Sequence, residues 1–298
     1  MWLLFAALSA LFAGASSILA KIGISDTDSN LRAALRTAVV LVFSWLMVFI
    51  TGEETELSSI DGRTLIFLIL SGVCTGASWL CYFKALSVGD INRVVPIDKS
   101  STILTIILGF IIFHETVGIL KLFSLAILAL GIFLMIEIKP SPKTNTSGVM
   151  SQASADTKSS GWFILAIGSA LFASLTTIFG KLGVGDLGSN LGTAIRTGVA
   201  LIFAWLLVIL TKKAGNIRKI DKRSWIFIIA SGAATGASWL CYYRALKDGV
   251  TSAVVAVDKL SLLVTIGFAL IVFKEKLSRR TLCGLILMTA ATLVMVIA

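Results

Sequence analysis

Long apolar stretches alternate with short polar segments along the whole chain. Ten stretches can be distinguished, five in each half: 2–20, 31–50, 64–88, 91–113 and 117–138, then 162–180, 191–210, 224–247, 251–273 and 279–297. A helix needs about 20 apolar residues to cross the roughly 30 Å hydrocarbon core of a bilayer. The pattern therefore predicts an all-α membrane protein with ten transmembrane helices.

The second half of the chain repeats the first. GASWLCYFKAL at 76–86 returns as GASWLCYYRAL at 236–246, a displacement of 236 − 76 = 160 residues, and the same displacement carries Arg36 to Arg196. Because five crossings deliver the chain to the other side of the membrane, the second copy is inserted upside down. We therefore predict two inverted five-helix repeats, an arrangement found in many secondary transporters. Four crossings per half would instead give a parallel repeat.

The repeat also divides the chain. We expect a first five-helix repeat at 1–138, a flexible linker at 139–160 and a second five-helix repeat at 161–298. The linker holds two of the three prolines and many Ser, Thr and Asn residues, a composition typical of flexible linkers. Segment 2–20 ends in small residues like those of a signal-peptide cleavage site, but its copy at 162–180 is internal. We therefore predict that it is a retained helix.

Composition narrows the class of protein. With 57% hydrophobic residues, 14% charged residues and a mean hydropathy of +0.96, the chain has too little polar surface for a water-soluble globule of its size. The sequence has no nucleophile–base set, metal cluster or phosphate loop, so we expect neither an enzyme nor a bound cofactor. The expected partners are membrane lipid and a small-molecule metabolite, without nucleic acid, for a monomer or weak homodimer.

The net charge of +10 is concentrated in loops and helix ends, where it predicts orientation. The second-half loops read KKAGNIRKIDKR at 212–223 and KEKLSRR at 274–280, whereas the loop at 53–61 carries three glutamates and an aspartate. Positively charged loops stay in the cytoplasm. Both termini are therefore expected on one side of a plasma (inner) membrane, and the loop charges place that side outside.

Charged residues also lie within the predicted spans. They are Arg36, Asp98 and Lys99 with their copies Arg196, Asp258 and Lys259. Each such charge costs roughly 2.5–3.5 kcal/mol at the centre of a span. They should therefore face one another or a watery cavity. One alternative is a structural ion pair in each repeat, Arg36 with Asp98 and Arg196 with Asp258. Lys99 and Lys259 would then remain uncompensated, which makes them the better candidates for ligand binding.

Helical spacing places these charges on a polar stripe. Asp98, Ser101 and Thr105 fall at i, i+3 and i+7, on one helix face, and the second repeat has the same series. The hydroxyl groups either contact substrate or bond to carbonyls of their own helix. Pro96 has no counterpart at Ala256. We therefore expect a local kink in the first repeat only.

Four aromatic residues lie deeper in the predicted spans than an interfacial belt requires: Trp79, Tyr82, Trp239 and Tyr242. They either pack between helices or form the wall of a cavity. Together with the charged groups they give the predicted substrate-binding set: Arg36, Trp79, Tyr82, Asp98, Lys99, Ser101, Arg196, Trp239, Tyr242, Asp258, Lys259 and Ser261. Near the helix ends, Lys21 and Lys181 are expected to reach lipid headgroups. Glu115 and Glu275 are expected to be solvated carboxylates at the membrane edge, with proton handling as the alternative.

At these positions the chain resembles a known family. The segments WLCYFKALSVGD, VVPIDKSS, WLCYYRALKDG and VVAVDKLS are similar to the EamA family of the drug/metabolite transporter superfamily. The resemblance covers all but the linker, and the chain looks like a tandem fusion of short single-repeat members. It implies ten helices around a central cavity and transport of small metabolites across an inner membrane. It also implies cytoplasmic termini, against the loop charges.

Together these patterns predict a secondary transporter, a permease or exporter, that works by alternating access. Among the deep charges four basic groups outnumber two acidic ones, so the substrate is expected to be anionic or amino-acid-like. Two alternatives remain: a flippase for a lipid-linked carrier, and a membrane scaffold without transport activity.

Overall fold

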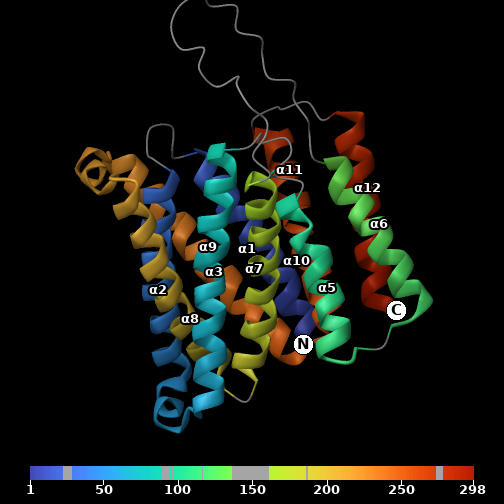
Figure 1. Ribbon diagram of the computed structural model, residues 1–298, viewed down its shortest axis with the longest axis horizontal. Coiled ribbons are helices and arrows are strands. Elements are labelled where there is room, and N and C mark those ends of the chain that lie inside the picture. The colour runs from blue at the N-terminus through green and yellow to red at the C-terminus, as the bar shows by residue number, and fades with distance from the viewer. Residues whose placement is uncertain are drawn as a thin grey trace, which may run out of the picture.

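The computed structural model describes residues 1–22, 29–88, 94, 97–115, 117–135, 161–185, 187–272 and 278–298, and every regular element in these ranges is a helix (Figure 1). The first repeat holds α1 (Trp2–Ile22), α2 (Ser29–Thr51), the 3₁₀ helix η1 (Glu53–Ser59), α3 (Gly62–Val88), α5 (Ser101–Ile112) and α6 (Ile119–Met135). The second holds α7 (Gly161–Val184), α8 (Ser189–Leu210), the 3₁₀ helix η2 (Ala214–Lys219), α9 (Lys222–Asp248), α10 (Thr251–Asp258), α11 (Ser261–Val272) and α12 (Arg279–Ile297).

Eight spans in the described part of the chain are long and apolar enough to cross a membrane, and one of them runs from α10 into α11. The apolar helix α6 is shorter. This confirms the prediction of an all-α, multi-pass membrane protein. The predicted linker at 139–160 and part of the predicted span at 91–113 lie outside the described residues.

The predicted ninth helix is interrupted at Lys259 and Leu260. α10 ends at Asp258 and α11 begins at Ser261, and the N–H of Lys259 donates to the carbonyl three residues earlier at 3.1 Å. Ser100, before α5, forms the same i→i−3 bond at 3.1 Å. The expectation of a kink in the first repeat only is therefore wrong. The tightened turn coincides with the Asp–Lys pair that both repeats carry, so proline is not its cause.

Helix contacts follow the sequence repeat. α1 packs against α9 and α3 against α7, which are the same contact after exchange of the repeats, while α2 packs on α8 and α6 on α12. Glycine allows two further approaches, α3 to α8 and α9 to α2: a Cβ at Gly72 would lie 2.6 Å from the Cβ of Val199, and one at Gly232 would lie 2.7 Å from that of Val39. The two halves are therefore interlocked through equivalent surfaces.

Figure 1 places both chain termini at one end of the bundle, here called the termini end. η1 and the turns that follow α7 and α9 lie at this end, whereas η2 lies at the opposite end. Asp61 caps α3 by accepting the N–H of Thr64 at 3.0 Å, and Asp221 caps α9 from Ser224 at 3.4 Å. The hydrogen bonds from Thr64 and Ser224 hold the pKa of each carboxyl below its usual value.

Candidate functional site

A cavity of about 320 Å³ lies between the two repeats. Both halves of the chain line it: Ala13, Ser101, Thr102, Thr105, Ala173, Thr177, Ser238, Trp239, Tyr242, Val255, Asp258 and Lys259. Its volume is at the lower end of the range for small-molecule sites. Five of the predicted substrate-binding residues are among these, and we call this space the central cavity.

The charged part of the central cavity is the break between α10 and α11. Lys259 Nζ lies 3.4 Å from Asp258 Oδ2, and the two side chains are 31% and 26% exposed. The hydroxyl of Ser9 donates to Asp258 at 3.5 Å. On the wall, the hydroxyls of Tyr242 and Thr177 lie 3.4 Å apart. A carboxylate, an ammonium group and several hydroxyls therefore converge on one space large enough for a metabolite.

The equivalent pair in the first repeat is arranged differently. Asp98 accepts a hydrogen bond from Ser169 at 2.7 Å, and its carboxylate is 4.0 Å from Lys99 Nζ. The Lys99 side chain is 60% exposed. Neither residue is among those that line the central cavity. The structure thus brings one of the two predicted Asp–Lys pairs to the cavity and leaves the other beside it.

A second, smaller cavity of about 170 Å³ surrounds Arg36, and we call it the Arg36 cavity. Its lining is Ala33, Arg36, Thr37, Val40, Trp79, Thr235 and Trp239. Arg36 Nη2 donates to Ser16 at 2.9 Å and to Thr235 at 2.7 Å. Trp239 lines this cavity as well as the central one. Two predicted tryptophans therefore form cavity walls, as one of the sequence alternatives held.

Arg196, the copy of Arg36, is enclosed. It is 2% exposed, donates to Ser71 at 3.1 Å and Thr75 at 3.0 Å, and lies over the ring of Tyr243 at 4.5 Å. The alternative of Arg–Asp ion pairs is therefore wrong. Each guanidinium instead faces hydroxyl groups on neighbouring helices.

The sequence analysis missed these hydroxyl groups. Their contacts repeat across the pseudo-two-fold: Ser9 with Ser238 at 3.2 Å and Ser169 with Ser78 at 3.3 Å, then Ser16 with Thr235 at 2.6 Å and Thr176 with Thr75 at 3.4 Å. The available signal was the seven-residue spacing of hydroxyls on α1 and α7, which places them on one helix face.

Tyr82 and Ser261 are not among the residues that line the two cavities. Tyr82 packs against a cluster formed by Ala85, Val94 and Ala166. Ser261 begins α11, and its carbonyl accepts the hydroxyl of Thr265 at 3.0 Å; Thr105 donates in the same way to Ser101 at 2.8 Å. Both threonine hydroxyls therefore bond to a carbonyl of their own helix, which was one of the two alternatives from the sequence.

Cross-repeat contacts fasten the termini end. Glu115 accepts the N–H groups of Thr251 at 2.5 Å and Ser252 at 3.2 Å, so it caps α10. Lys181 Nζ donates to the carbonyl of Gly249 at 2.8 Å and lies 4.0 Å from Glu115. The expectation that Lys181 reaches headgroups and that Glu115 is simply solvated is wrong, because both side chains are engaged inside the bundle. Glu275 and the side chain of Lys21 lie outside the described residues.

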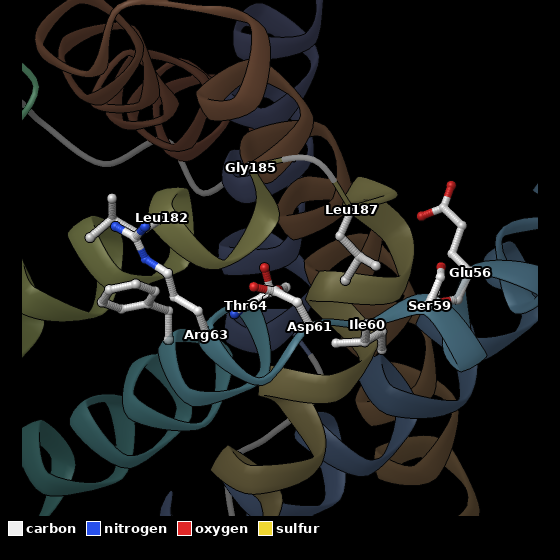
Figure 2. A pocket seen from close by; sticks show the side chains of 10 residues that line it. Glu56, Ser59, Ile60, Asp61, Arg63, Thr64, Leu182, Gly185 and Leu187 are labelled. Carbon is white, nitrogen blue, oxygen red and sulfur yellow. Dashed lines mark hydrogen bonds between the residues drawn. The ribbon is translucent and has the colours of Figure 1, made fainter.

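η1 makes a second such connection. Glu53 accepts the N–H of Leu191 at 2.8 Å and Glu56 that of Gly188 at 2.5 Å, so the first repeat caps α8 of the second. A depression of about 580 Å³ beside η1 is shown in Figure 2 with Asp61 and Arg63 on its rim. Because Glu56 and Asp61 are already used as helix caps, we do not assign this depression to substrate.

Comparison with known proteins gives consistent matches. The sequence profile of the EamA-like transporter family matches residues 1–137 and 160–297. The uncharacterized transporter in the cobO 3' region of Sinorhizobium sp. is 40% identical over 134 residues, which are 45% of this chain and 95% of that relative. The uncharacterized transporter YxxF of Bacillus subtilis (strain 168) is 21% identical over 238 residues, 77% of this chain and 70% of the relative. A crystal structure with 11% identity aligns with a TM-score of 0.76 over 99% of this chain and 97% of the other, which shows a shared fold.

Proposed function

Because this chain belongs to the EamA-like transporter family, we propose that it is a secondary transporter that moves a small metabolite across the plasma (inner) membrane by alternating access. Two inverted five-helix repeats, ten helices in all, form its working unit. The match of the family profile in two separate parts supports a tandem fusion of single-repeat ancestors.

The observation that carries this proposal is the central cavity between the repeats. Its charged wall is a break in a membrane-spanning helix, where α10 meets α11 at Asp258 and Lys259. Interrupted helices near the middle of the membrane are where secondary transporters bind substrate, at the interface of their repeats.

The chemistry of the cavity supports an anionic or amino-acid-like substrate. Lys259 supplies an ammonium group for a carboxylate or phosphate, and Asp258 supplies an acceptor for an amino or hydroxyl group. Trp239 and Tyr242 supply apolar walls for the body of the molecule. Alternating access then requires the two repeats to exchange conformations, so that the contacts at the termini end open as those at the opposite end close.

The test has two stages. A thermal-shift screen of the purified protein against metabolites should find ligands that raise its melting temperature, because binding to the folded state stabilises it. Those ligands should then show counterflow in proteoliposomes preloaded with the same compound. If no stabilising metabolite undergoes counterflow in the wild-type protein, the transport proposal fails. Stabilisation confined to long-chain phospholipids would instead favour the flippase alternative.

A further inference from the structure

The two repeat-related arginines lie in different surroundings. Arg36 borders a cavity with two tryptophans, whereas Arg196 is 2% exposed and lies under Tyr243. In both, the hydrogen-bond acceptors are neutral hydroxyls, and among the described residues no carboxylate lies within 4.0 Å of either guanidinium. A guanidinium cannot be deprotonated in a protein, so each site retains an uncompensated positive charge.

Two buried polar atoms beside Arg196 are unsatisfied. Arg196 Nη1 and the hydroxyl of Thr197 have no hydrogen-bond partner among the described residues, and Thr197 is 0% exposed. A buried group without a partner costs about 1–3 kcal/mol. Their copies in the first repeat are Arg36 and Thr37, and both line the Arg36 cavity. Arg36 Nε is unsatisfied too, but the Thr37 hydroxyl donates to Ala33 at 2.8 Å, so the two repeats differ at the threonine. The unsatisfied Thr197 hydroxyl lies where the pseudo-two-fold places an equivalent cavity.

The polar and aromatic lining of that equivalent cavity is present in the sequence, whereas Ala33 and Val40 are replaced by Thr193 and Ala200. Exchange of the repeats converts Arg36, Thr37, Thr235 and the tryptophan pair into Arg196, Thr197, Thr75 and the same tryptophan pair. In this conformation Trp239 lies 5.2 Å from the Arg196 guanidinium and also lines the Arg36 cavity. One site is open while its counterpart is filled by aromatic rings.

We propose that Arg36 and Arg196 form two equivalent subsites for an oxyanion, a carboxylate or a phosphate group, which open alternately as the repeats exchange conformations. This inference rests on the proposed transport function and names the chemical group that its substrate carries. The planar guanidinium binds both oxygens of such a group in parallel. The hydroxyl of Thr37 already donates to the carbonyl of Ala33 at 2.8 Å, so the guanidinium is the group that binds the oxyanion, and the tryptophan rings cover the rest of the ligand.

Thiol labelling tests the alternation. In a background with Cys74, Cys81, Cys241 and Cys283 replaced by serine, Thr37→Cys and Thr197→Cys are prepared singly and reconstituted in sealed phosphatidylcholine vesicles of known orientation. Membrane-impermeant methanethiosulfonates are added from either face. Thr37→Cys should react from one face only and Thr197→Cys from the opposite face only. Reaction of both from the same face, or no reaction at position 197, overturns the proposal.

A matched control pair distinguishes cavity exposure from lipid exposure. Val42 on α2 and its copy Ile202 on α8 are 71% and 69% exposed on the lipid-facing surface. Cysteines at these positions should react from neither face, because the thiolate does not form in hydrocarbon. If cysteines at positions 42 and 202 reacted as fast as the cysteine at position 37, labelling would no longer support the subsites.

The oxyanion preference is tested with reagent charge. The rate ratio of the anionic ethylsulfonate reagent to the cationic trimethylammonium reagent at Thr37→Cys should fall about tenfold with Arg36→Gln and recover with Arg36→Lys. At Thr197→Cys the same rate ratio should fall about tenfold with Arg196→Gln. An unchanged ratio overturns the oxyanion assignment. Repeating the assay with phosphatidylglycerol vesicles, or with inorganic phosphate added, shows whether a lipid headgroup or a free anion protects the cysteine.

Failure of this inference is separable from failure of the transport proposal. Labelling requires no transported substrate. If both cysteines react from the same face while counterflow is intact, the alternating subsites are excluded and the transport proposal is not. If they react from opposite faces but no counterflow is found, the transport proposal is excluded and the alternating subsites are not.

Discussion

Both repeat-related arginines, and Asp98, are held by hydroxyl groups. Arg36 donates to Ser16 and Thr235, and Asp98 accepts from Ser169. The positions of the charges could be predicted from the sequence because charged residues stand out in apolar spans. Their partners could not, since a serine in a membrane helix satisfies itself through its own carbonyls unless a neighbouring helix brings another group. Helix-wheel spacing defines a face but does not say which helix that face meets, and this is why the Arg–Asp pairs were wrong.

The hydrogen bond from Ser169 to Asp98 offers a matched pair of mutations. Ser169→Ala removes a donor at 2.7 Å from a carboxylate and should destabilise the protein by about 1–3 kcal/mol. Its copy Ser9 lies 3.5 Å from Asp258, so Ser9→Ala should cost less. Thermal unfolding of both variants in detergent measures the difference. An equal loss would mean that the two carboxylates depend equally on these hydroxyls.

Lys259 and Lys99 should differ in substrate binding. Lys259 lines the central cavity, whereas Lys99 is not among its lining residues and has a side chain that is 60% exposed. Loss of one charge-assisted hydrogen bond, about 1.5–3 kcal/mol, weakens affinity by roughly tenfold or more, so Lys259→Ala should do so and Lys99→Ala should do so less. Titration of the ligand's thermal shift measures both. If the well-inserted double variant transports normally, neither lysine belongs to the site.

At the scale of helices, the sequence predicted lengths better than interruptions. Hydropathy detects how long an apolar stretch is, and α12 (Arg279–Ile297) coincides with the predicted span at 279–297. It does not detect where a helix tightens, because the turn between α10 and α11 needs no proline or glycine. Both residues of the charged pair at that turn, Asp258 and Lys259, line the central cavity.

Close helix contacts make a second prediction at this scale. A Cβ at Gly131 on α6 would lie 2.8 Å from the backbone nitrogen of Met288 on α12, whereas nothing lies within 4 Å of one at Gly267 on α11. Gly131→Ala should therefore destabilise the protein by about 1–3 kcal/mol, since the helices must separate. Gly267→Ala should be neutral or stabilising by up to about 1 kcal/mol. Thermal unfolding of the purified variants distinguishes these outcomes, and equal melting temperatures would contradict the close α6–α12 contact.

For the whole molecule, the position of η1 and η2 at opposite ends of the bundle predicts membrane sidedness. In the cysteine-free background, Ser58→Cys and Gly215→Cys should react with impermeant maleimide from opposite faces. The basic loop that holds Gly215 should be cytoplasmic, because positively charged loops are retained there. Labelling of both from one face would end the inverted-repeat interpretation, and labelling of Gly215→Cys from outside would support the orientation typical of the family.

In the part of the chain that the structure describes, one set of carboxylate caps has a counterpart of different chemistry in the repeat. Glu53 and Glu56, which cap α8, correspond to Lys213 and Asn216 near the end where α2 begins. An ammonium group cannot accept an amide hydrogen bond, and a cation beside a helix N-terminus is unfavourable. If the two repeats were identical, the two conformations related by the two-fold would have equal free energy. The different residues at these cap positions remove that equality. Under the proposed exchange of conformations, this difference favours the conformation in which the caps of α8 are made, and a ligand that needs the other conformation should bind the empty protein with a reduced apparent affinity.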